Sequence, residues 1–319
     1  GNCSLAVQQM IAIARAVDMD CKVLILDEPT SSLDEKEVQM LFGLMRDLRS
    51  RGVGIVFVTH FLEQVYAVCD RITVLRNGQL VGEYPIQELP QVELVTKMMG
   101  KELDDLSGME KKPYQPQPGS VPVYEAEGLS SAAGVRPYDF RIEKGEVNGF
   151  TGLLGSGRSE SVRAIFGADP GVTGDLYIKG TKTRISSPKA AVRHGLAFVT
   201  EDRKHTGIIA GMAVDQNITL SSLQNYAPGG FLRHRLEEET AGSYVKELKI
   251  KTPTVNTDIA SLSGGNQQKA LLARWLCTEA DVIIMDEPTR GIDVGAKREI
   301  YMLINQLTQM GKAVIMVSS

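Results

Sequence analysis

The clearest chemical motif is a glycine-rich turn at residues 152–159, with the sequence Gly-Leu-Leu-Gly-Ser-Gly-Arg-Ser. Its spacing matches G-x-x-x-x-G-K-[ST], a loop whose backbone N–H groups surround nucleotide phosphates at the start of a helix. Arg158 replaces the lysine of that pattern, and its planar fork need not reach the β- and γ-phosphates as a lysine does. Ser159 offers a hydroxyl ligand to Mg²⁺. The turn therefore predicts nucleotide binding by Gly152, Gly155, Ser156, Gly157, Arg158, Ser159 and Glu160.

Two apolar runs each end in the same tetrapeptide, Asp-Glu-Pro-Thr, at residues 27–30 and at residues 286–289. A carboxylate at the C-terminal end of a parallel strand lies at the crevice where ligands bind. The aspartate can hold Mg²⁺ through water, and the glutamate can polarise an attacking water. Asp27 and Asp286 are therefore candidate metal ligands, and Glu28 and Glu287 are candidate catalytic residues.

These tetrapeptides belong to an internal repeat. Positions 8–60 align without gaps on positions 267–319, at a shift of 259 residues, and 15 of the 53 pairs are identical. Each copy has the pattern helix, strand, turn, helix, strand. The strands are continuous apolar runs, which is typical of a parallel sheet covered on both faces. The period is too long for a solenoid and indicates two copies of one large α/β domain.

A proline-rich segment separates the two copies. Four prolines fall within residues 113–122, which predicts a semi-extended linker. We expect a first domain at 1–105, a linker at 106–122 and a second domain at 123–319. No glycine-rich loop precedes the first tetrapeptide, the chain does not start with Met, and it stops directly after an apolar run. We therefore expect a piece of a longer chain, truncated at both ends, with its first domain incomplete.

Composition argues against several classes of protein. The chain has 35 Lys and Arg against 39 Asp and Glu, a formal net charge of −4, whereas coating nucleic acid requires a surplus of cations. Its 43% hydrophobic and 23% charged residues are values of a globular protein, not of a disordered one. No run approaches 18 apolar residues, so no membrane-spanning segment is predicted. The four cysteines lack the spacing of a metal site.

A second motif, Leu-Ser-Gly-Gly-Asn-Gln-Gln at residues 262–268, lies between the glycine-rich turn and the second tetrapeptide. The three motifs together resemble the ATP-binding cassette (ABC) ATPases. The resemblance implies the P-loop NTPase fold, with a parallel-sheet core and a helical signature subdomain in two tandem copies. It also implies ATP and Mg²⁺ as ligands. Each ATP would be held by the phosphate loop and Asp-Glu pair of one domain and by the signature motif of the other.

Carried over residue by residue, the resemblance implies two unequal sites. The first would combine the signature motif with Glu28 and with His60, which stands at the position of the family's switch histidine. The second has Arg158 in its loop, a facing motif at 3–9 that lacks both glycines, and Ser319 in place of the histidine. We expect this second site to hydrolyse ATP slowly or not at all. The further implied nucleotide contacts are Ser4, Asp34, Asp293, Ser263, Gly264, Gly265 and Gln267.

Additional segments narrow the resemblance to the ATP-binding subunits of bacterial monosaccharide importers. They are Thr-Glu-Asp-Arg-Lys at 200–204 and Gln-Asn-Ile-Thr at 216–219, while residues 60–66 and 88–94 most resemble the galactofuranose-importer branch. The resemblance implies a dimer of membrane permease subunits as partner, contacted through the surface near 201–219. It implies an indirect partnership with a periplasmic sugar-binding protein, no nucleic-acid partner, and a peripheral position on the cytoplasmic face of the inner membrane.

Two other functions remain open from the residues alone. One is a soluble ATPase of the same superfamily that acts on nucleic acid or the ribosome, although the chain has neither zinc-type cysteine clusters nor a basic arm. The other is a nucleotide sensor without turnover, which Arg158 and the lost glycines favour. We also expect this chain alone to be a weak ATPase or an inactive one, even if a longer parent protein is active.

Overall fold

The computed structural model describes residues 11–15, 21–30, 33, 35–59, 61–76, 78–99, 114, 119–152, 155–290, 292 and 294–318. The chain divides into two compact units, and each is described by itself. Unit 1 comprises Gly1–Lys111 with Asp293–Gly295, and unit 2 comprises Lys112–Ile292 with Ala296–Ser319. The division falls inside the segment 106–122. The assignment of both parts as cassette domains remains a prediction.

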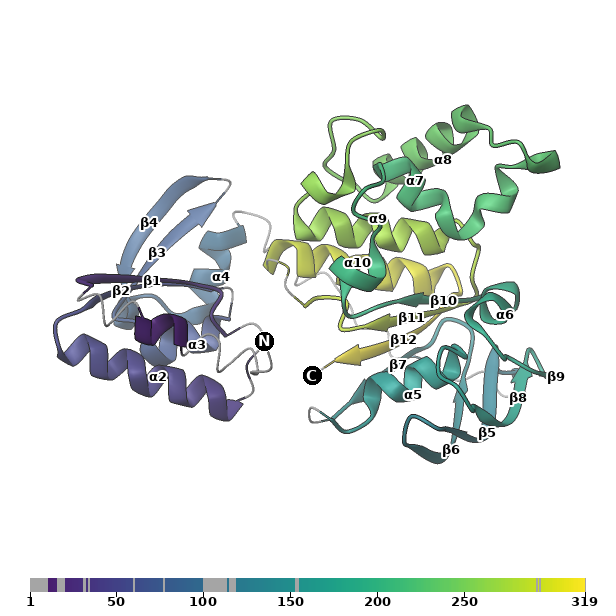
Figure 1. The fold of residues 1–319 in the computed structure, drawn as a ribbon, viewed down its shortest axis with the longest axis horizontal. Coiled ribbons are helices and arrows are strands. Elements are labelled where there is room, and N and C mark those ends of the chain that lie inside the picture. The colour runs from purple at the N-terminus through teal and green to yellow at the C-terminus, as the bar shows by residue number, and fades with distance from the viewer. Residues whose placement is uncertain are drawn as a thin grey trace. The chain divides into compact units, whose positions relative to one another are not determined.

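Unit 2 is built on a four-stranded parallel sheet with the strand order β10-β11-β12-β7. Strand β11 is buried along its whole length because apolar layers cover both faces of the sheet. Figure 1 shows the sheet between two helices on one side and a third helix with a second sheet on the other. The elements are β7 (Val147–Thr151), α5 (Arg158–Ile165), β10 (Leu196–Val199), α9 (Gly264–Leu276), β11 (Val282–Asp286), α10 (Val294–Gln309) and β12 (Ala313–Ser318).

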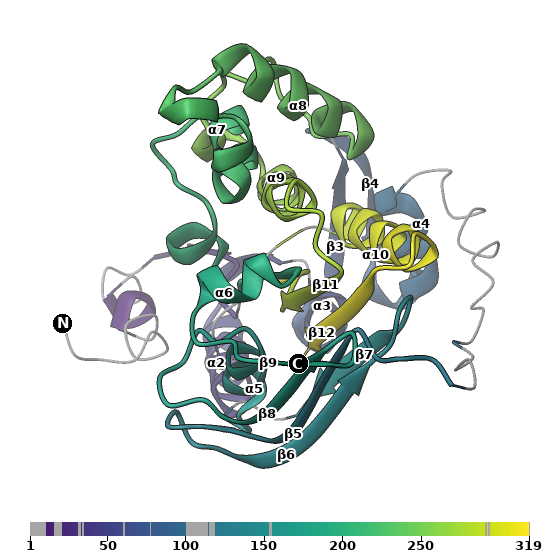
Figure 2. The same cartoon turned by 90° about the vertical axis from the view of Figure 1, so that its right-hand side faces the viewer.

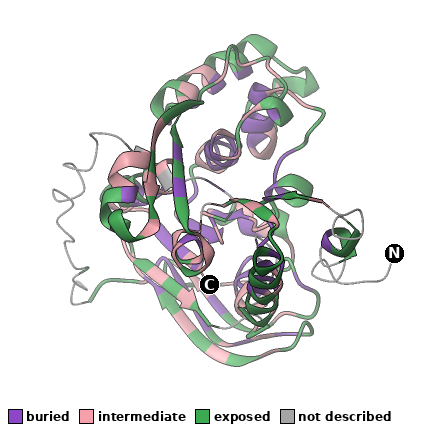
Figure 3. Ribbon diagram, turned by 90° about the vertical axis from the view of Figure 1, so that its left-hand side faces the viewer, coloured by how far each residue is buried: buried purple, intermediate pink, exposed green. Residues whose placement is uncertain are grey.

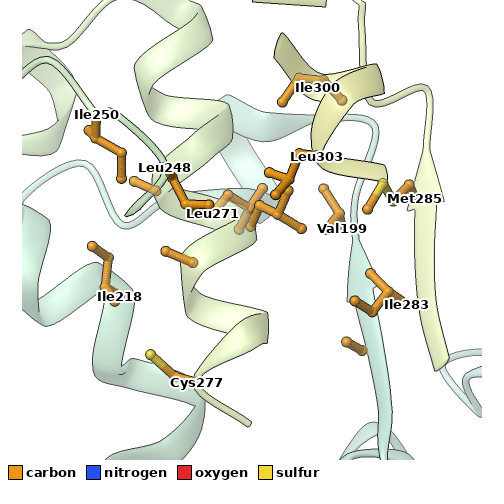
Figure 4. Packing of buried hydrophobic residues seen from close by; sticks show 14 of the residues in the cluster. Val199, Ile218, Leu248, Ile250, Leu271, Cys277, Ile283, Met285, Ile300 and Leu303 are labelled. Atoms are coloured by element: carbon orange, nitrogen blue, oxygen red, sulfur yellow. The ribbon is translucent and has the colours of Figure 1, made fainter. Parts of the chain in front are cut away.

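The side chains of β11 alternate between two hydrophobic cores. Ile283 and Met285 pack into the core formed with α9 and α10 (Figure 4). Val282 and Ile284 pack into the core formed with α5 and an antiparallel sheet of order β6-β5-β8-β9. That sheet consists of β5 (Tyr124–Ser131), β6 (Val135–Ile142), β8 (Thr173–Ile178) and β9 (Thr181–Thr183), and α6 (Pro188–Arg193) leads from it to β10.

A helical group packs against α9, as Figure 2 shows for its two labelled helices α7 and α8. The buried guanidinium of Arg274 joins this group to α9: it donates to the carbonyls of Asn217 and Gly207 and to Asn217 Oδ1, at 2.6–2.7 Å. Three charge-assisted bonds satisfy a cation that burial would otherwise make costly. The group contains the π-helical turn η3 (Arg203–Gly207), α7 (Val214–Thr219), η4 (Leu220–Asn225), η5 (Pro228–Gly230), α8 (His234–Glu247) and η6 (Ile259–Ser261).

Unit 1 contains a second copy of the β11–α10–β12 module. Its strands β1 and β2 pair in parallel with Val23 opposite Gly54, and the equivalent pair in unit 2, 259 residues later, is Val282 opposite Ala313. A β-hairpin and two helices follow the module. The elements are β1 (Val23–Asp27), α2 (Glu35–Ser50), β2 (Gly54–Val58), α3 (Leu62–Val68), β3 (Arg71–Arg76), β4 (Gln79–Pro85), η1 (Ile86–Glu88) and α4 (Gln91–Met99).

One face of the β1–β2 sheet is exposed, which corrects the prediction that both copies are covered on both faces. Leu24 and Leu26 point into a core with α2, whereas Ile25 is 69% exposed. Its counterpart in unit 2, Ile284, is 0% exposed because α5 and the antiparallel sheet cover it. Among the described residues of unit 1, no element takes the place of that layer. Figure 3 colours the ribbon of the described residues by burial.

Candidate functional site

The glycine-rich turn of unit 2 connects β7 to α5 beneath the carboxyl ends of the parallel strands. Gly155 and Gly157 have φ values of 77° and 88°, a left-handed conformation that glycine adopts without steric cost. Gly157 is the N-cap of α5 and has no side chain to bond the N–H groups of the first turn. Those donors and the positive end of the helix dipole suit an anion such as a phosphate. The placement agrees with the role that the sequence predicts for the turn.

Ser159 and Asp286 meet at the first turn of α5. The Ser159 hydroxyl donates to Asp286 Oδ1 at 3.2 Å, and Asp286 is only 3% exposed at the end of β11. Burial raises the pKa of Asp286 above its usual value, Glu287 adds to the rise, and Ser159 and Arg158 oppose it. A hydroxyl and a buried carboxylate are hard oxygen ligands that suit Mg²⁺, which usually keeps several waters and takes phosphate oxygens. The pair therefore fits the predicted metal role without requiring a larger protein cage.

Arg158 points toward protein groups at the ends of two strands. Its Nη1 donates to the carbonyl oxygen of Ser318 in β12 at 2.8 Å and lies 3.6 Å from Glu287 Oε1. The side chains of Arg158 and Glu287 are 11% and 13% exposed. Arg158 and Glu287, predicted as a phosphate ligand and a catalytic residue, therefore form an ion pair with each other.

Both predicted catalytic glutamates have the same backbone geometry. Glu28 and Glu287 have φ values of 47° and 45°, in the left-handed region that non-glycine residues seldom occupy. Glu28 donates its N–H to the carbonyl of Val58, and Glu287 donates to that of Val317, its counterpart in the repeat. The two turns differ in burial, since Asp27 is exposed and Asp286 is buried. The repeat thus reproduces the carboxylate turn in both units.

The structure gives separate positions to the four predicted residues of the second motif. Ser263 is the exposed N-cap of α9, and Gly264 is half-buried beside it. Gly265 is buried against α10, and a Cβ there would come within 2.7 Å of Ala296 Cβ. Gln267 is also buried, where its amide donates to carbonyls of η6 and accepts from Arg203. Packing therefore explains Gly265 and Gln267, and only the first two remain accessible at the helix start.

Four predicted site residues lie outside the described part of the chain: Ser4, Asp34, His60 and Asp293. The described site also contains a contact that sequence reasoning missed. Glu201, predicted as part of a partner-binding surface, forms an ion pair with Arg290, three residues after Glu287. The sequence indication of this ion pair is a charged residue after each of two strands, β10 and β11. These two strands are paired neighbours in the sheet. This contact ties the segment after β10 to the carboxylate turn.

Comparison with known proteins finds a family match for part of the chain. The ABC transporter family matches residues 135–290, which contain the glycine-rich turn, the second motif and Asp286-Glu287. These residues form an ABC transporter ATP-binding domain. The P-loop NTPase fold predicted from the sequence is confirmed. No helix among the described residues is long and apolar enough to cross a membrane.

Relatives of the chain are bacterial sugar-import proteins. The ribose import ATP-binding protein of Bacillus licheniformis is 44% identical over 320 residues, which cover 100% of this chain and 64% of the relative. The galactofuranose transporter ATP-binding protein of Escherichia coli K12 is 48% identical over 319 residues, covering 99% and 63%. The chain thus spans less than two thirds of the length of these relatives. The names of these relatives agree with the resemblance to sugar-import ATP-binding proteins.

Solved structures support the fold alone. An ATP-binding cassette, dimeric in a post-hydrolysis state bound to ADP and Pi, has a TM-score of 0.53 at 22% identity and covers 61% of this chain and 87% of its own. A Clostridium perfringens subunit, part of an ABC transporter complex, has a TM-score of 0.50 at 20% identity and covers 62% and 78%.

Proposed function

We propose that the chain is the ATP-binding part of an ABC importer for a monosaccharide, in which binding and hydrolysis of ATP drive transport. The observation that carries the proposal is the Ser159–Asp286 contact at the start of α5, beside a glycine turn open to an anion. That arrangement offers hydrogen-bond donors to phosphates and oxygen ligands to Mg²⁺ at one point. The names of the relatives, which include ribose and galactofuranose importers, support a monosaccharide as the cargo.

Each site residue has a proposed task. In unit 2 the turn at 152–157 binds phosphates, Ser159 and Asp286 hold Mg²⁺, and Glu287 orients water. In unit 1, Asp27 holds Mg²⁺ and Glu28 polarises the attacking water. Mg²⁺ neutralises charge on the phosphates when bound. The further nucleotide contacts that we propose, in part with a nucleotide held by another cassette, are Ser4, Asp34, His60, Ser156, Glu160, Ser263, Gly264 and Asp293.

We further propose that the two carboxylate turns differ in catalysis. Glu28 is the main catalytic base, whereas ATP hydrolysis at the Glu287 turn is slow. Arg158 supports this assignment because it engages the Glu287 carboxylate and a strand carbonyl. The same contact favours a second candidate function, a unit 2 that binds nucleotide without turning it over. ATP turnover by the complete importer distinguishes slow hydrolysis in unit 2 from nucleotide binding without turnover. It is measured with Glu28→Gln and with Glu287→Gln separately. Equal losses of ATPase activity would contradict the asymmetry.

The proposed partners are membrane permease subunits, contacted through the surface at 201–219, with a periplasmic sugar-binding protein as an indirect partner. Ile209 supports a protein contact there because it is exposed, while Asn217 fixes its backbone by accepting from the Ile209 N–H and donating to its carbonyl. A rigid loop that presents an apolar side chain suits docking. This arrangement would place the chain on the cytoplasmic face of the membrane.

Nucleotide titration tests the proposal directly. We expect the chain to bind ATP, and we expect Mg²⁺ to strengthen the affinity. Asp286→Asn should weaken the ATP affinity measured with Mg²⁺ by about tenfold or more. With EDTA the variant should lose no affinity relative to the wild type. Asp175→Asn is a matched control because its carboxylate forms an exposed ion pair with Lys182, outside the site. Absence of ATP binding at millimolar concentrations would refute the proposed function.

A further inference from the structure

Arg158 is held by two protein acceptors at once. One nitrogen, Nη1, donates to Ser318 O at 2.8 Å and faces Glu287 Oε1 at 3.6 Å. Ser318 ends β12, Glu287 follows β11, and Arg158 starts α5. The single side chain therefore joins the helix that carries the phosphate loop to the ends of two neighbouring strands.

Burial makes this contact costly to break. With 11% and 13% exposure, neither the guanidinium nor the carboxylate is well solvated, and an unpaired charge in such a place is strongly destabilising. An anionic partner therefore stabilises Arg158 beyond the Ser318 carbonyl, and the structure supplies Glu287. A nucleotide phosphate can recruit the guanidinium only in competition with that carboxylate.

We propose that Arg158 is a positioning residue that binds Glu287 and Ser318, so that nucleotide phosphates and Glu287 compete for one guanidinium. We call this contact of Arg158 with Glu287 and Ser318 the latch. The inference rests on the proposed function, since it concerns the same nucleotide site. The latch holds the cation away from phosphates and at the same time engages the carboxylate that would orient water. It gives one physical cause for the slow hydrolysis that we propose for unit 2.

The latch predicts that neutralising Glu287 tightens nucleotide binding through Arg158. Fluorescent mant-ADP in EDTA is the probe, because neither hydrolysis nor Mg²⁺ coordination then contributes. We expect Glu287→Gln to bind mant-ADP about tenfold more tightly than the wild type, a coupling of the size found between contacting residues. In the Arg158→Gln background the same substitution should change the affinity less than about twofold, because there is no guanidinium to release.

The double-mutant design separates the latch from simple repulsion. If Glu287 only repelled the phosphates, Glu287→Gln would tighten binding by the same factor in both backgrounds, and the latch would be refuted. Unchanged affinity in Glu287→Gln would also refute it. Asp175→Asn, which removes a carboxylate from an exposed pair, is the control and should bind as the wild type does.

Two further measurements keep the result decisive. If Glu287→Gln fails to fold by circular dichroism, Arg158→Lys replaces it: an ammonium lacks the planar fork, so the latch predicts tighter mant-ADP binding, and weaker binding overturns it. If the wild type binds neither ADP nor ATP, the proposed function itself fails. If the wild type binds ADP and Glu287→Gln changes the mant-ADP affinity by the same factor in both backgrounds, the latch alone is refuted.

Discussion

The hydroxyl of Ser159 donates to the carboxylate of Asp286 at 3.2 Å, across 127 residues of sequence. The contact brings the second residue of α5 to the end of β11, where the glycine turn opens. Because both groups offer oxygen to a hard cation, the contact sets the place of Mg²⁺ in the proposed site. Removing the Ser159 hydroxyl therefore tests this contact.

Ser159→Ala should weaken ATP binding only when Mg²⁺ is present. The substitution removes an oxygen ligand but leaves the backbone donors of the turn, so we expect a loss of about three- to tenfold with Mg²⁺ and little change in EDTA. Ser161→Ala is the matched control on the same helix, because the Ser161 hydroxyl bonds back to the carbonyl of Gly157. Equal losses with and without Mg²⁺ would assign Ser159 to phosphate rather than metal.

The sequence predicted the repeated module well because the repeat constrains it locally. Helices α2 and α10 begin and end 259 residues apart, and the strands pair in the same register. The apolar runs, their carboxylate ends and the turns are local patterns, so they could be read from residue types alone.

Features that depend on distant parts of the chain could not be predicted. Ile25 and Ile284 are identical residues at equivalent positions, yet one is exposed and the other buried, since burial depends on which layer packs on the sheet. The sequence predicts Gln267 as a nucleotide contact, and it gives no sign that the amide oxygen of Gln267 accepts from Arg203, 64 residues earlier. The direction of Arg158 likewise depends on Ser318, 160 residues away.

Replacing Arg274 should destabilise unit 2 strongly. Arg274→Met leaves the carbonyl of Gly207 and the oxygens of Asn217 without their buried donor, so we expect a loss of about 2–4 kcal/mol in the free energy of unfolding, at about 1–3 kcal/mol for each acceptor left without a partner. The fluorescence of Trp275, the only tryptophan in the sequence, follows this unit during urea unfolding. Arg235→Met, which removes an exposed pair with Glu239, should change it by less than about 0.5 kcal/mol. Similar effects of both substitutions would contradict the structural role.

The thiol of Cys277 should resist alkylation at neutral pH. Burial raises its pKa to about 11, so the reactive thiolate is scarce at pH 8 and becomes more populated as the pH rises toward 11. Since the unfolded thiol ionises at lower pH, this group also stabilises unit 2 below about pH 8.5, and that contribution declines as the pH rises further.

Iodoacetamide labelling followed by peptide mass spectrometry measures the reactivity of the Cys277 thiol. Cys21, half-exposed in unit 1, is the comparison. Faster labelling of Cys277 than of Cys21 in the folded chain would contradict the burial.

Truncating the two equivalent isoleucines should destabilise the protein by unequal amounts. Ile284→Ala opens a cavity in a fully buried core and should cost about 2–5 kcal/mol, whereas Ile25→Ala removes a mostly exposed side chain and should cost less than about 0.5 kcal/mol. Urea unfolding measures both, by Trp275 fluorescence for unit 2 and, for unit 1, by the part of the circular dichroism change that Trp275 fluorescence does not follow.

The exposed face gives a second readout for the same pair. Val23, Ile25, Val56 and Val58 form a contiguous apolar surface on β1 and β2, the kind of patch that binds hydrophobic dyes. Ile25→Ala should therefore reduce the fluorescence of bound anilinonaphthalene sulfonate in the folded chain, because it removes apolar area without exposing any other. Leu26→Ala, on the buried face of the same strand, should raise the dye signal by loosening the core with α2. A dye signal that Ile25→Ala leaves unchanged would mean that this face is covered in solution.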